Sequence, residues 1–346
     1  MLTAAQENAL DHVRRQVEHS APAAQERIHR LLAKQGTAFD LGLLGVGLLQ
    51  ISSITVNFHP DRLLADGRSV AEALLQDGLY RNQVETGISA GGLTAFSGGE
   101  RDLWEERLFG GAYQLPGVAA SDRPKYGGLN LARYREGACP RFGSCHLLLH
   151  HHVDARASFA FGDSVTQPVD WGMAGNMLPI LAALSEVLGT RENLLGREDV
   201  TPLALLQALC SGIPLEMPNT PSRAFDTYVE THVHGPLDLS RDVESVVMDP
   251  SFRDTLAEAV LRKAAARFGF SLQWHSGYRM AADEFRAEFR GPTIPPLAAY
   301  VQREFGKDQA LDAAVIGRAA VSVVKEPERW RTWGPPGEVL QYIKYL

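Results

Sequence analysis

The N-terminal part of the chain changes from helical spacing to strand-like alternation. Apolar residues first recur at intervals of three or four, as on one face of a helix; they are Leu10, Val13, Val17, Ile28, Leu31 and Leu32. Thr3 and Gln6 have the spacing of a capping box, and Ala21-Pro22 predicts the junction of two helices. From Ile54 to His59 apolar and polar residues alternate, which predicts a strand with His59 on its polar face.

The middle and C-terminal parts of the chain predict further helices around a β region. A short helix is expected from Ser69 to its stop at Gly78, and the glycine-rich residues 80–145 predict loops and short strands. Helical spacing, or a capping residue followed by proline, then predicts helices at five places: 179–188, 202–210, 249–269, 295–306 and 308–326. The first two of these helices form an insertion between strand regions.

Residues 228–234, YVETHVH, alternate again. One face of the predicted strand carries Tyr228, Glu230, His232 and His234, and the other carries Val229, Thr231 and Val233. The valines are expected to enter the core, so that Glu230 faces a cleft or solvent. A solvated glutamate is the ordinary alternative. A row of a tyrosine, a glutamate and two histidines is an unusual choice for an idle surface, and it favours a functional site.

The composition narrows the class of protein. The chain has 346 residues, 45% of them apolar, which suffices for the core of one large or two ordinary domains. The longest apolar stretch, 41–49, is interrupted by glycines and is much too short for a membrane span. A formal charge of −7 and a pI near 5.9 argue against a nucleic-acid partner.

The N-terminus and the cysteines bear on the cellular compartment. The first residues mix charges of both signs without an apolar core, unlike a secretory signal. Cys139, Cys145 and Cys210 are too few and too irregular for a disulfide framework and lack zinc-ligand spacing. We expect the cytoplasm, or export as an effector into a host cell by a route without a classical signal peptide.

Two motifs contain residues suited to a phosphate or a ribose. His59 and Arg62 follow the first strand in NFHPDR, where they suit ribose and phosphate but equally a turn with a surface ion pair. Thr86 and Ser89 lie in QVETGISAGG, which is either a surface loop or a run whose backbone amides approach a ligand. The pattern Gly87-x-Ser89-x-Gly91 also matches a nucleophile elbow, but the glycine-rich residues that follow cannot start the helix it requires.

Aromatic residues and histidines supply two further sets of candidates. Among the glycines of the middle region stand four rings that either stack on flat ligands or plug a loop-rich core: Trp104, Phe109, Tyr113 and Tyr126. Two pairs of histidines have the H-x-H spacing seen in some metal sites: His150 with His152, and His232 with His234. No acidic ligand stands at a recognisable spacing, so a polar strand end and no metal are expected.

Several strings in order along residues 54–275 resemble one bacterial family: ITVNFHPDR, SVAEALLQDGLYRNQVETGIS, WEERLFGGAY, RPKYGGLN, PRFGSCHLLL, YVETHVHG and DPSF. The family is that of the CteC-type effectors, ADP-ribosyltransferases that modify ubiquitin on threonine. The resemblance implies an α+β fold with a split β-sheet core and with helical N-terminal, inserted and C-terminal segments. It also implies NAD⁺ as co-substrate and a protein acceptor, ubiquitin.

The resemblance also predicts the domain organisation. An N-terminal helical segment is expected over 1–50, and an ADP-ribosyltransferase-like catalytic domain over 51–248. The helical insertion lies near 172–222 within that domain, and a C-terminal helical region follows over 249–346.

The resemblance finally assigns roles to single residues. His59 or Arg62 grips NAD⁺, three middle residues, Thr86, Ser89 and Tyr126, complete the NAD⁺ site, and Glu230 is the catalytic carboxylate. Tyr228 stands where arginine-modifying relatives carry an acid, which favours a hydroxyl acceptor. Two alternatives stay open: a hydrolase that uses Ser89 or a histidine-rich metal site, and a protein-interaction module without activity.

Overall fold

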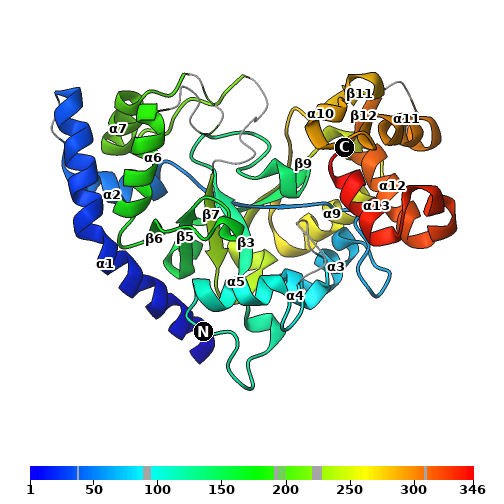
Figure 1. Ribbon diagram of the computed structural model, residues 1–346. Coiled ribbons are helices and arrows are strands. Elements are labelled where there is room, and N and C mark those ends of the chain that lie inside the picture. Colours follow the sequence, from blue (N-terminus) through cyan, green and yellow to red (C-terminus); the bar gives the residue numbers. More distant parts are fainter. Residues whose placement is uncertain are drawn as a thin grey trace.

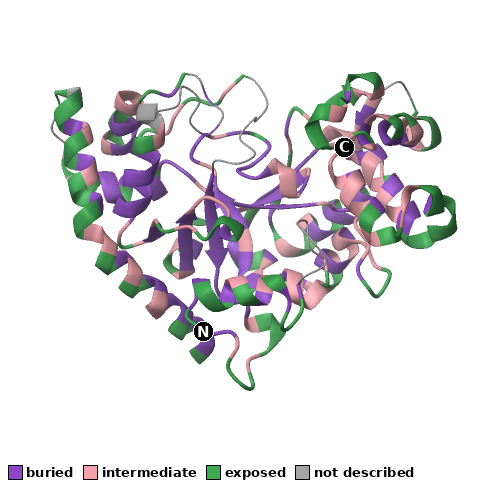
Figure 2. Ribbon diagram, in the orientation of Figure 1, coloured by how far each residue is buried: buried purple, intermediate pink, exposed green. Residues whose placement is uncertain are grey.

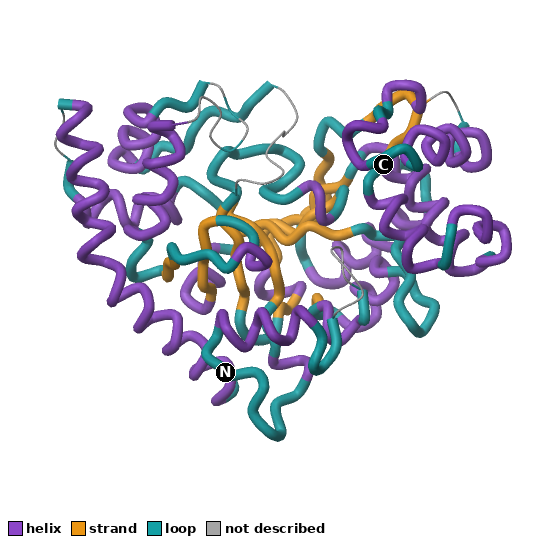
Figure 3. The backbone as a smooth tube through the Cα atoms, viewed as in Figure 1, coloured by secondary structure: helices purple, strands orange, loops and turns teal. Residues whose placement is uncertain are grey.

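A computed structural model of the chain describes residues 1–346 except 37–38, 89–94, 191–194, 196, 198, 220–227 and 308–309. The protein has an α+β fold in which one large, mostly antiparallel sheet lies between two groups of helices (Figure 1). Figure 3 shows the strands gathered at the centre of the molecule, with helices on both sides of them. The α+β expectation is confirmed at this level.

Eight strands form the main sheet, in the order β10-β9-β4-β1-β3-β7-β5-β6. Their bounds are β1 Ile54–Phe58, β3 Lys125–Leu129, β4 Cys145–Leu149, β5 Ala157–Phe161, β6 Trp171–Met173, β7 Val229–Val233, β9 Val243–Met248 and β10 Ser271–Trp274. Neighbouring strands are antiparallel except for β9 and β10. The ladder between β1 and β3 is short, since it joins only Ile54 to Leu129 and Thr55 to Gly128.

Four further strands form two small ladders: β2 Leu79–Tyr80 with β8 Leu237–Asp238, and β11 Arg279–Ala281 with β12 Ala310–Asp312. β10 belongs to the main sheet although it follows residue 248. The main sheet therefore includes strands from both sides of the predicted boundary between residues 248 and 249.

The two faces of the main sheet differ in chemistry, although both are buried (Figure 2). Alternate residues such as Val56, Leu147, Val229 and Val246 enter the main hydrophobic core, together with helices from both ends of the chain. The opposite face is polar; it carries Thr55, Asn57, His146, Ser158, Glu230 and His232. The predicted alternation along β1 and β7 is confirmed, but the polar side of each strand is buried as well.

The N-terminus forms one helix where the sequence predicted two. α1 runs over Ala4–Gln35 with Pro22 inside it, and Figure 1 shows it as a single bent helix. Proline removes one backbone hydrogen bond and usually ends or kinks a helix. Here the buried residues Val17, Ala24 and Ile28 on both sides of Pro22 keep the helix against the rest of the protein. The predicted capping box of Thr3 and Gln6 is present.

Seven other helices lie in the described part of the first 250 residues. They are α2 Leu41–Gln50, α3 Val70–Asp77, α4 Gln83–Thr86, α5 Glu100–Leu108, α6 Leu178–Thr190, α7 Pro202–Ser211 and α8 Leu239–Asp242. Of these, α3, α6 and α7 were predicted as single helices. Gly78 ends α3 in the left-handed region and Thr201 caps α7, as predicted, and Ser69, predicted to begin α3, is its N-cap. α5 was not predicted, because glycines surround it and obscure its short helical pattern. α6 continues through Gly189 to Thr190.

The C-terminal part forms a second core of its own. α9 Leu256–Phe268 packs on the main sheet, whereas α10 Ala287–Arg290, α11 Ile294–Phe305, α12 Ala313–Lys325 and α13 Pro336–Lys344 lie together (Figure 1). α11, α12 and α13 enclose Trp330 in the second core. Asp249 caps only a 3₁₀ turn, and Thr255 caps α9, so the helix predicted from residue 249 starts later.

Short 3₁₀ turns connect several of these elements: η1 Ala120–Asp122, η2 Pro140–Phe142, η3 His151–Arg156, η4 Ser164–Thr166, η5 Pro250–Phe252, η6 Ala282–Glu284 and η7 Pro327–Trp333. Within the described part of the chain, none of the helices has both the length and the apolar character that crossing a membrane requires.

Candidate functional site

Glu230 lies at the middle of β7, on the polar face of the sheet. The β-branched residues Val229, Thr231 and Val233 favour the extended backbone and point to the opposite face. The neighbours of Glu230 across the sheet are small, Gly128 of β3 and Ala160 of β5, and this leaves room for a carboxylate. Only 4% of Glu230 is exposed, so the prediction that its carboxylate faces a cleft or solvent is wrong.

Three groups hydrogen-bond the Glu230 carboxylate. The Tyr228 hydroxyl donates to Oε2 at 2.9 Å, and the backbone N–H of Ser164 donates to the same oxygen at 3.4 Å. His232 Nε2 lies 2.8 Å from Oε1. Burial raises the pKa of Glu230, but these hydrogen bonds and the charge of His232 outweigh it and hold the pKa below its usual range. Glu230 is therefore a buried carboxylate that is ionised at neutral pH.

A chain of hydrogen bonds extends from Glu230 through the interior of the protein. His232 Nδ1 lies 3.2 Å from Ser158 Oγ, and Ser158 Oγ lies 3.1 Å from His234 Nε2. His234 Nδ1 in turn contacts the hydroxyl of Tyr113. Burial and the neighbouring charges of His232, Lys125 and Arg156 hold the pKa of His234 well below its usual value, so this ring is neutral.

The acceptor character of the carboxylate sets the direction of the first bond of this chain. His232 donates to Glu230 Oε1 through Nε2–H. The directions of the bonds that join Ser158 to His232 and His234, and His234 to Tyr113, depend on where the protons of the two rings lie. The groups that donate to Glu230 itself are Tyr228, Ser164 and His232.

Ser158, His232 and Glu230 also have the order of a Ser-His-acid triad. The triad partners are within hydrogen-bond distance, but Ser158 and His232 have no exposed surface. A serine nucleophile must reach the substrate carbonyl. This arrangement therefore supports the ionisation of Glu230 and does not present a nucleophile.

Tyr126, predicted to contact NAD⁺, lies beside His232 on the same face. Its ring meets the His232 ring edge-on at 5.2 Å between centroids, and the guanidinium of Arg101 lies 5.0 Å from the ring centroid. The Tyr126 hydroxyl donates to Glu105 Oε1 at 3.1 Å, and Glu105 pairs with Arg123. Tyr126 thus holds His232 in place on the side of the site that α5 covers.

His59 and Arg62 lie just beyond the end of β1, where they meet cations from other parts of the chain. Burial and the positive charges of Arg62 and Lys344 lower the pKa of His59 to about 4, so this imidazole is neutral at pH 7. Burial and the charges of Arg141, Arg290 and Arg62 lower the pKa of Lys344 to about 8, against the opposing charge of Asp163. We call Arg62, Arg141, Arg290 and Lys344 the cationic cluster.

Arg141 connects the cationic cluster to Glu230. Its guanidinium lies 5.7 Å from the centroid of the Tyr228 ring, whose hydroxyl donates to Glu230, and it forms an ion pair with Asp163. Neither Arg62 nor Lys344 has an ion pair or a side-chain hydrogen bond within the described ranges. Because Arg62 and Lys344 are half-buried cations without such a partner, they form a site suited to an anionic ligand.

Thr86 and Ser89 contribute less to this geometry. The hydroxyl of Thr86 donates to the backbone oxygen of Asn82 at 3.0 Å, at the end of α4, and accepts from the Ile88 N–H. Thr86 therefore stabilises its own turn. Ser89, and with it the possible nucleophile elbow, lies outside the described residues.

The histidine pairs do not form a metal site in the part of the chain that the structure describes. No group of three or more histidine, cysteine or acidic side chains is placed to hold a metal ion there. His150 and His152 stack on one another at 5.9 Å between centroids, and His152 donates to the buried carboxylate of Asp242. His232 and His234 are instead members of the hydrogen-bond chain behind Glu230.

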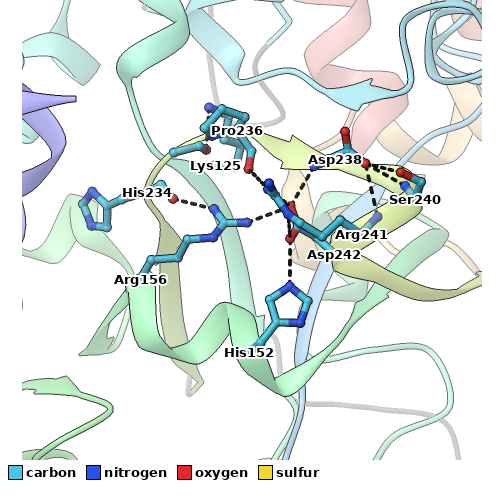
Figure 4. Close-up of polar contacts among 10 residues, drawn as sticks. Lys125, His152, Arg156, His234, Pro236, Asp238, Ser240, Arg241 and Asp242 are labelled. Atoms are coloured by element: carbon cyan, nitrogen blue, oxygen red, sulfur yellow. Dashed lines mark hydrogen bonds and ion pairs between the residues drawn. The ribbon is translucent and has the colours of Figure 1, made fainter. Parts of the chain in front are cut away.

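Asp242 organises a polar cluster at the end of β7 (Figure 4). Arg156, Arg241 and His152 all hydrogen-bond its carboxylate, and Arg156 also donates to the backbone oxygen of His234. Lys125 donates to the backbone oxygen of Gly235, which follows His234. The cluster thereby fixes the strand end from which His232 and His234 extend.

Comparison with known proteins places most of the chain in one family. A family model described as "Protein of unknown function (DUF3626)" matches residues 53–346. The chain belongs to the DUF3626 family. No curated protein matches the sequence. The DUF3626 match includes Glu230, the hydrogen-bond chain and the cationic cluster, while α1 and α2 precede it.

Several residues of this DUF3626 site were not predicted from the sequence. They are Arg141, Ser158, Asp163, Ser164, Arg290 and Lys344. Arg141 alone stood in a string that carried the family resemblance, PRFGSCHLLL. Ser158 and Lys344 lie 72 and 114 positions from Glu230, and only strand pairing and helix packing bring them to the site.

Proposed function

We propose that this DUF3626 protein is an NAD⁺-dependent mono-ADP-ribosyltransferase that modifies a hydroxyl side chain of a protein acceptor, a threonine of ubiquitin. The observation that carries the proposal is the buried, ionised carboxylate of Glu230, held by Tyr228 and His232 and located beside the cationic cluster. The reaction needs NAD⁺ as co-substrate and no metal. The acceptor is proposed on the resemblance to CteC-type effectors, and Tyr228 agrees with it because an arginine acceptor calls for an acid there.

Glu230 has the chemistry that the transfer requires. The bond between the ribose and the nicotinamide nitrogen breaks, and its electron pair leaves with nicotinamide. Positive charge then develops on the ribose as in glycoside hydrolysis, and a fixed carboxylate stabilises it. The acceptor oxygen forms the new bond and loses its proton. The hydrogen bonds from Tyr228, His232 and the Ser164 N–H keep the carboxylate charged and in place throughout.

The cationic cluster suits the pyrophosphate of NAD⁺. Arginines fork to phosphate oxygens. The low pKa of Lys344 reflects burial and also neighbouring positive charges, and a bound anion would neutralise those charges. His59 is neutral and is able to hydrogen-bond a ribose hydroxyl. Both His59 and Arg62 thus have roles in the proposal: Arg62 binds the pyrophosphate, and His59 hydrogen-bonds the ribose.

The sheet supports an ADP-ribosyltransferase-like split core as part of the proposal. β1 and β3 pair over only two residue pairs, with β10-β9-β4-β1 on one side and β3-β7-β5-β6 on the other. The paired part of the two strands therefore ends at Thr55 and Gly128. His59 belongs to the first half and Glu230 to the second, as expected of a dinucleotide bound between two half-sheets.

The function is tested by following both products of the reaction. Purified protein is incubated with NAD⁺ and ubiquitin, and separately with NAD⁺ and a cell lysate. We expect released nicotinamide and a mass gain of one ADP-ribose on the acceptor, with fragmentation spectra that place it on threonine. Absence of nicotinamide release with every acceptor would exclude the transferase and favour an interaction module.

Substitution of Arg62 tests the pyrophosphate site. Arg62→Ala is expected to raise the KM for NAD⁺ by about tenfold to a hundredfold, because one charge-assisted hydrogen bond is lost. The kcat is expected to change less, and Arg62→Lys to lie between. Arg331→Ala, at an arginine that is 81% exposed on the C-terminal turn η7, is the control. An unchanged KM in Arg62→Ala would remove Arg62 from the NAD⁺ site.

A further inference from the structure

A small pocket of about 90 Å³ lies beside Glu230, between α1, α5 and η4. Its walls include Gln16, Trp104, Arg107, Ser164, Gln167 and Trp171. Arg107 and Gln167 are exposed and form its outer part, whereas Ser164 and Trp171 are buried and form its inner part. The pocket therefore leads from the surface into the protein.

The inner end of the pocket adjoins the catalytic carboxylate. Ser164 lines the pocket, and its backbone N–H donates to Glu230 Oε2 at 3.4 Å. The Trp171 ring, on the same inner wall, lies 5.8 Å from the His232 ring between centroids. Ser164 and Trp171 thus contact both the pocket and the site formed by Glu230 and His232.

The size of the pocket limits its occupant. Pockets that enclose a whole ligand measure about 300–1,000 Å³, so this one holds a single short side chain. We infer that the pocket is the acceptor subsite of the proposed transferase, and that it receives a short, uncharged side chain bearing a hydroxyl. This inference rests on the proposed function and names the part of the protein that selects the acceptor.

The polar groups of the pocket fit a hydroxyl-bearing segment. The indole N–H of Trp104 and the side-chain amide of Gln167 have no hydrogen-bond partner among the residues that the structure describes. Both lie in the pocket wall, where a hydroxyl or a backbone group of the acceptor can use them. The Trp104 and Trp171 rings supply an apolar surface for a methyl group.

The charges around the pocket differ between its outer wall and its inner end. Arg107 lines the pocket itself, and the guanidinium of Arg101 lies 5.5 Å from the Trp104 ring centroid. These two positive charges repel an arginine or lysine side chain at the wall, whereas the carboxylate of Glu230 lies beyond Ser164. Val165 and Val169, which adjoin the wall residues in the sequence, are exposed and offer an apolar surface to the residues flanking the acceptor hydroxyl.

The test separates acceptor binding from chemistry on NAD⁺. Trp104→Ala and Gln167→Ala are compared with the native protein in two assays: nicotinamide release from NAD⁺ and water alone, and transfer of ADP-ribose to ubiquitin. We expect the KM for ubiquitin to rise by about tenfold or more in Trp104→Ala, with a smaller rise in Gln167→Ala. Nicotinamide release without acceptor is expected to stay within about twofold of the native rate.

Trp274→Ala is the matched control. Trp274 is a half-buried tryptophan with an arginine over its ring, like Trp104, but it lies on the edge strand β10. It is expected to leave both assays unchanged. Gln167 is exposed, so its variant remains informative if Trp104→Ala folds poorly.

Two results would overturn the inference. Normal nicotinamide release together with a native KM for ubiquitin in both variants would show that the acceptor binds elsewhere, and would leave the proposed function intact. Absence of nicotinamide release by the native protein, with or without ubiquitin, would overturn the proposed function and the acceptor subsite together.

Discussion

Replacing Glu230 by glutamine is expected to lower the rate of ADP-ribose transfer by about 10²–10³-fold while the protein stays folded. Glutamine has the shape of glutamate and retains one oxygen to accept from His232. Its NH₂ group replaces the oxygen that accepts from Tyr228 and Ser164, so the Tyr228 hydroxyl must turn to accept and the Ser164 N–H loses its partner. The negative charge that stabilises the ribose cation is lost. The measurement is nicotinamide release under saturating NAD⁺, with thermal unfolding of both proteins as the check on folding.

The control for Glu230→Gln is the same substitution at a second buried glutamate. Glu136 is 3% exposed and accepts a hydrogen bond from Ser276, away from the contacts of Glu230. Glu136→Gln is expected to retain nearly native activity. A native rate in Glu230→Gln would refute the catalytic assignment, and equal losses in both variants would indicate a general sensitivity to buried changes.

The pH dependence of the proposed activity follows from the same charge. Hydrogen bonds from His232, Tyr228 and Ser164 outweigh burial and lower the pKa of Glu230. Activity that requires the ionised carboxylate is therefore present above this pKa and lost as pH falls through it. The acidic limb of the rate profile should lie below the ordinary range for glutamate and should be missing in Glu230→Gln.

Local patterns in the sequence predicted the parts of the site that lie within one element. Alternation placed Tyr228, Glu230 and His232 on one face of β7, and the structure confirms that shared face. The helix caps Thr3 and Thr201 were also predicted, because a cap is a contact between residues three apart. Burial of both faces of the sheet was missed, since it depends on segments distant in sequence.

The contacts that give the site its chemistry are long-range and were outside the reach of such patterns. Ser158 meets His232 because β5 pairs with β7, and Arg141 meets Tyr228 because residues 138–142 pack on the polar face. Lys344 reaches the cationic cluster through the packing of α13. Pro22 shows the reverse case, in which tertiary packing overrides a correct local rule.

The Asp242 cluster is where the structure predicts the greatest loss of stability on substitution (Figure 4). Asp242 is fully buried, and its carboxylate accepts from Arg156, Arg241, His152 and the backbone N–H of Asp238. Although burial acts to raise it, these contacts hold the pKa of Asp242 far below its usual value. The single negative charge of Asp242 thus compensates the positive charges of Arg156 and Arg241 at the end of β7, next to His234.

Asp242→Ala is expected to lower the free energy of unfolding by about 3–5 kcal/mol, because removing one partner leaves the half-buried Arg156 without its carboxylate. Urea unfolding followed by circular dichroism measures the change. Asp66→Ala, which breaks an ion pair of Arg68 with a half-exposed carboxylate, is the control and should cost much less, because solvent screens such a pair. The pKa of Asp242 is depressed in the folded state, so its contribution is complete above the unfolded pKa of aspartate and falls as the solution is acidified below it. The difference between native protein and Asp242→Ala should therefore shrink as pH is lowered. Equal losses for Asp66→Ala and Asp242→Ala, or a difference independent of pH, would contradict this account of how the end of β7 is held.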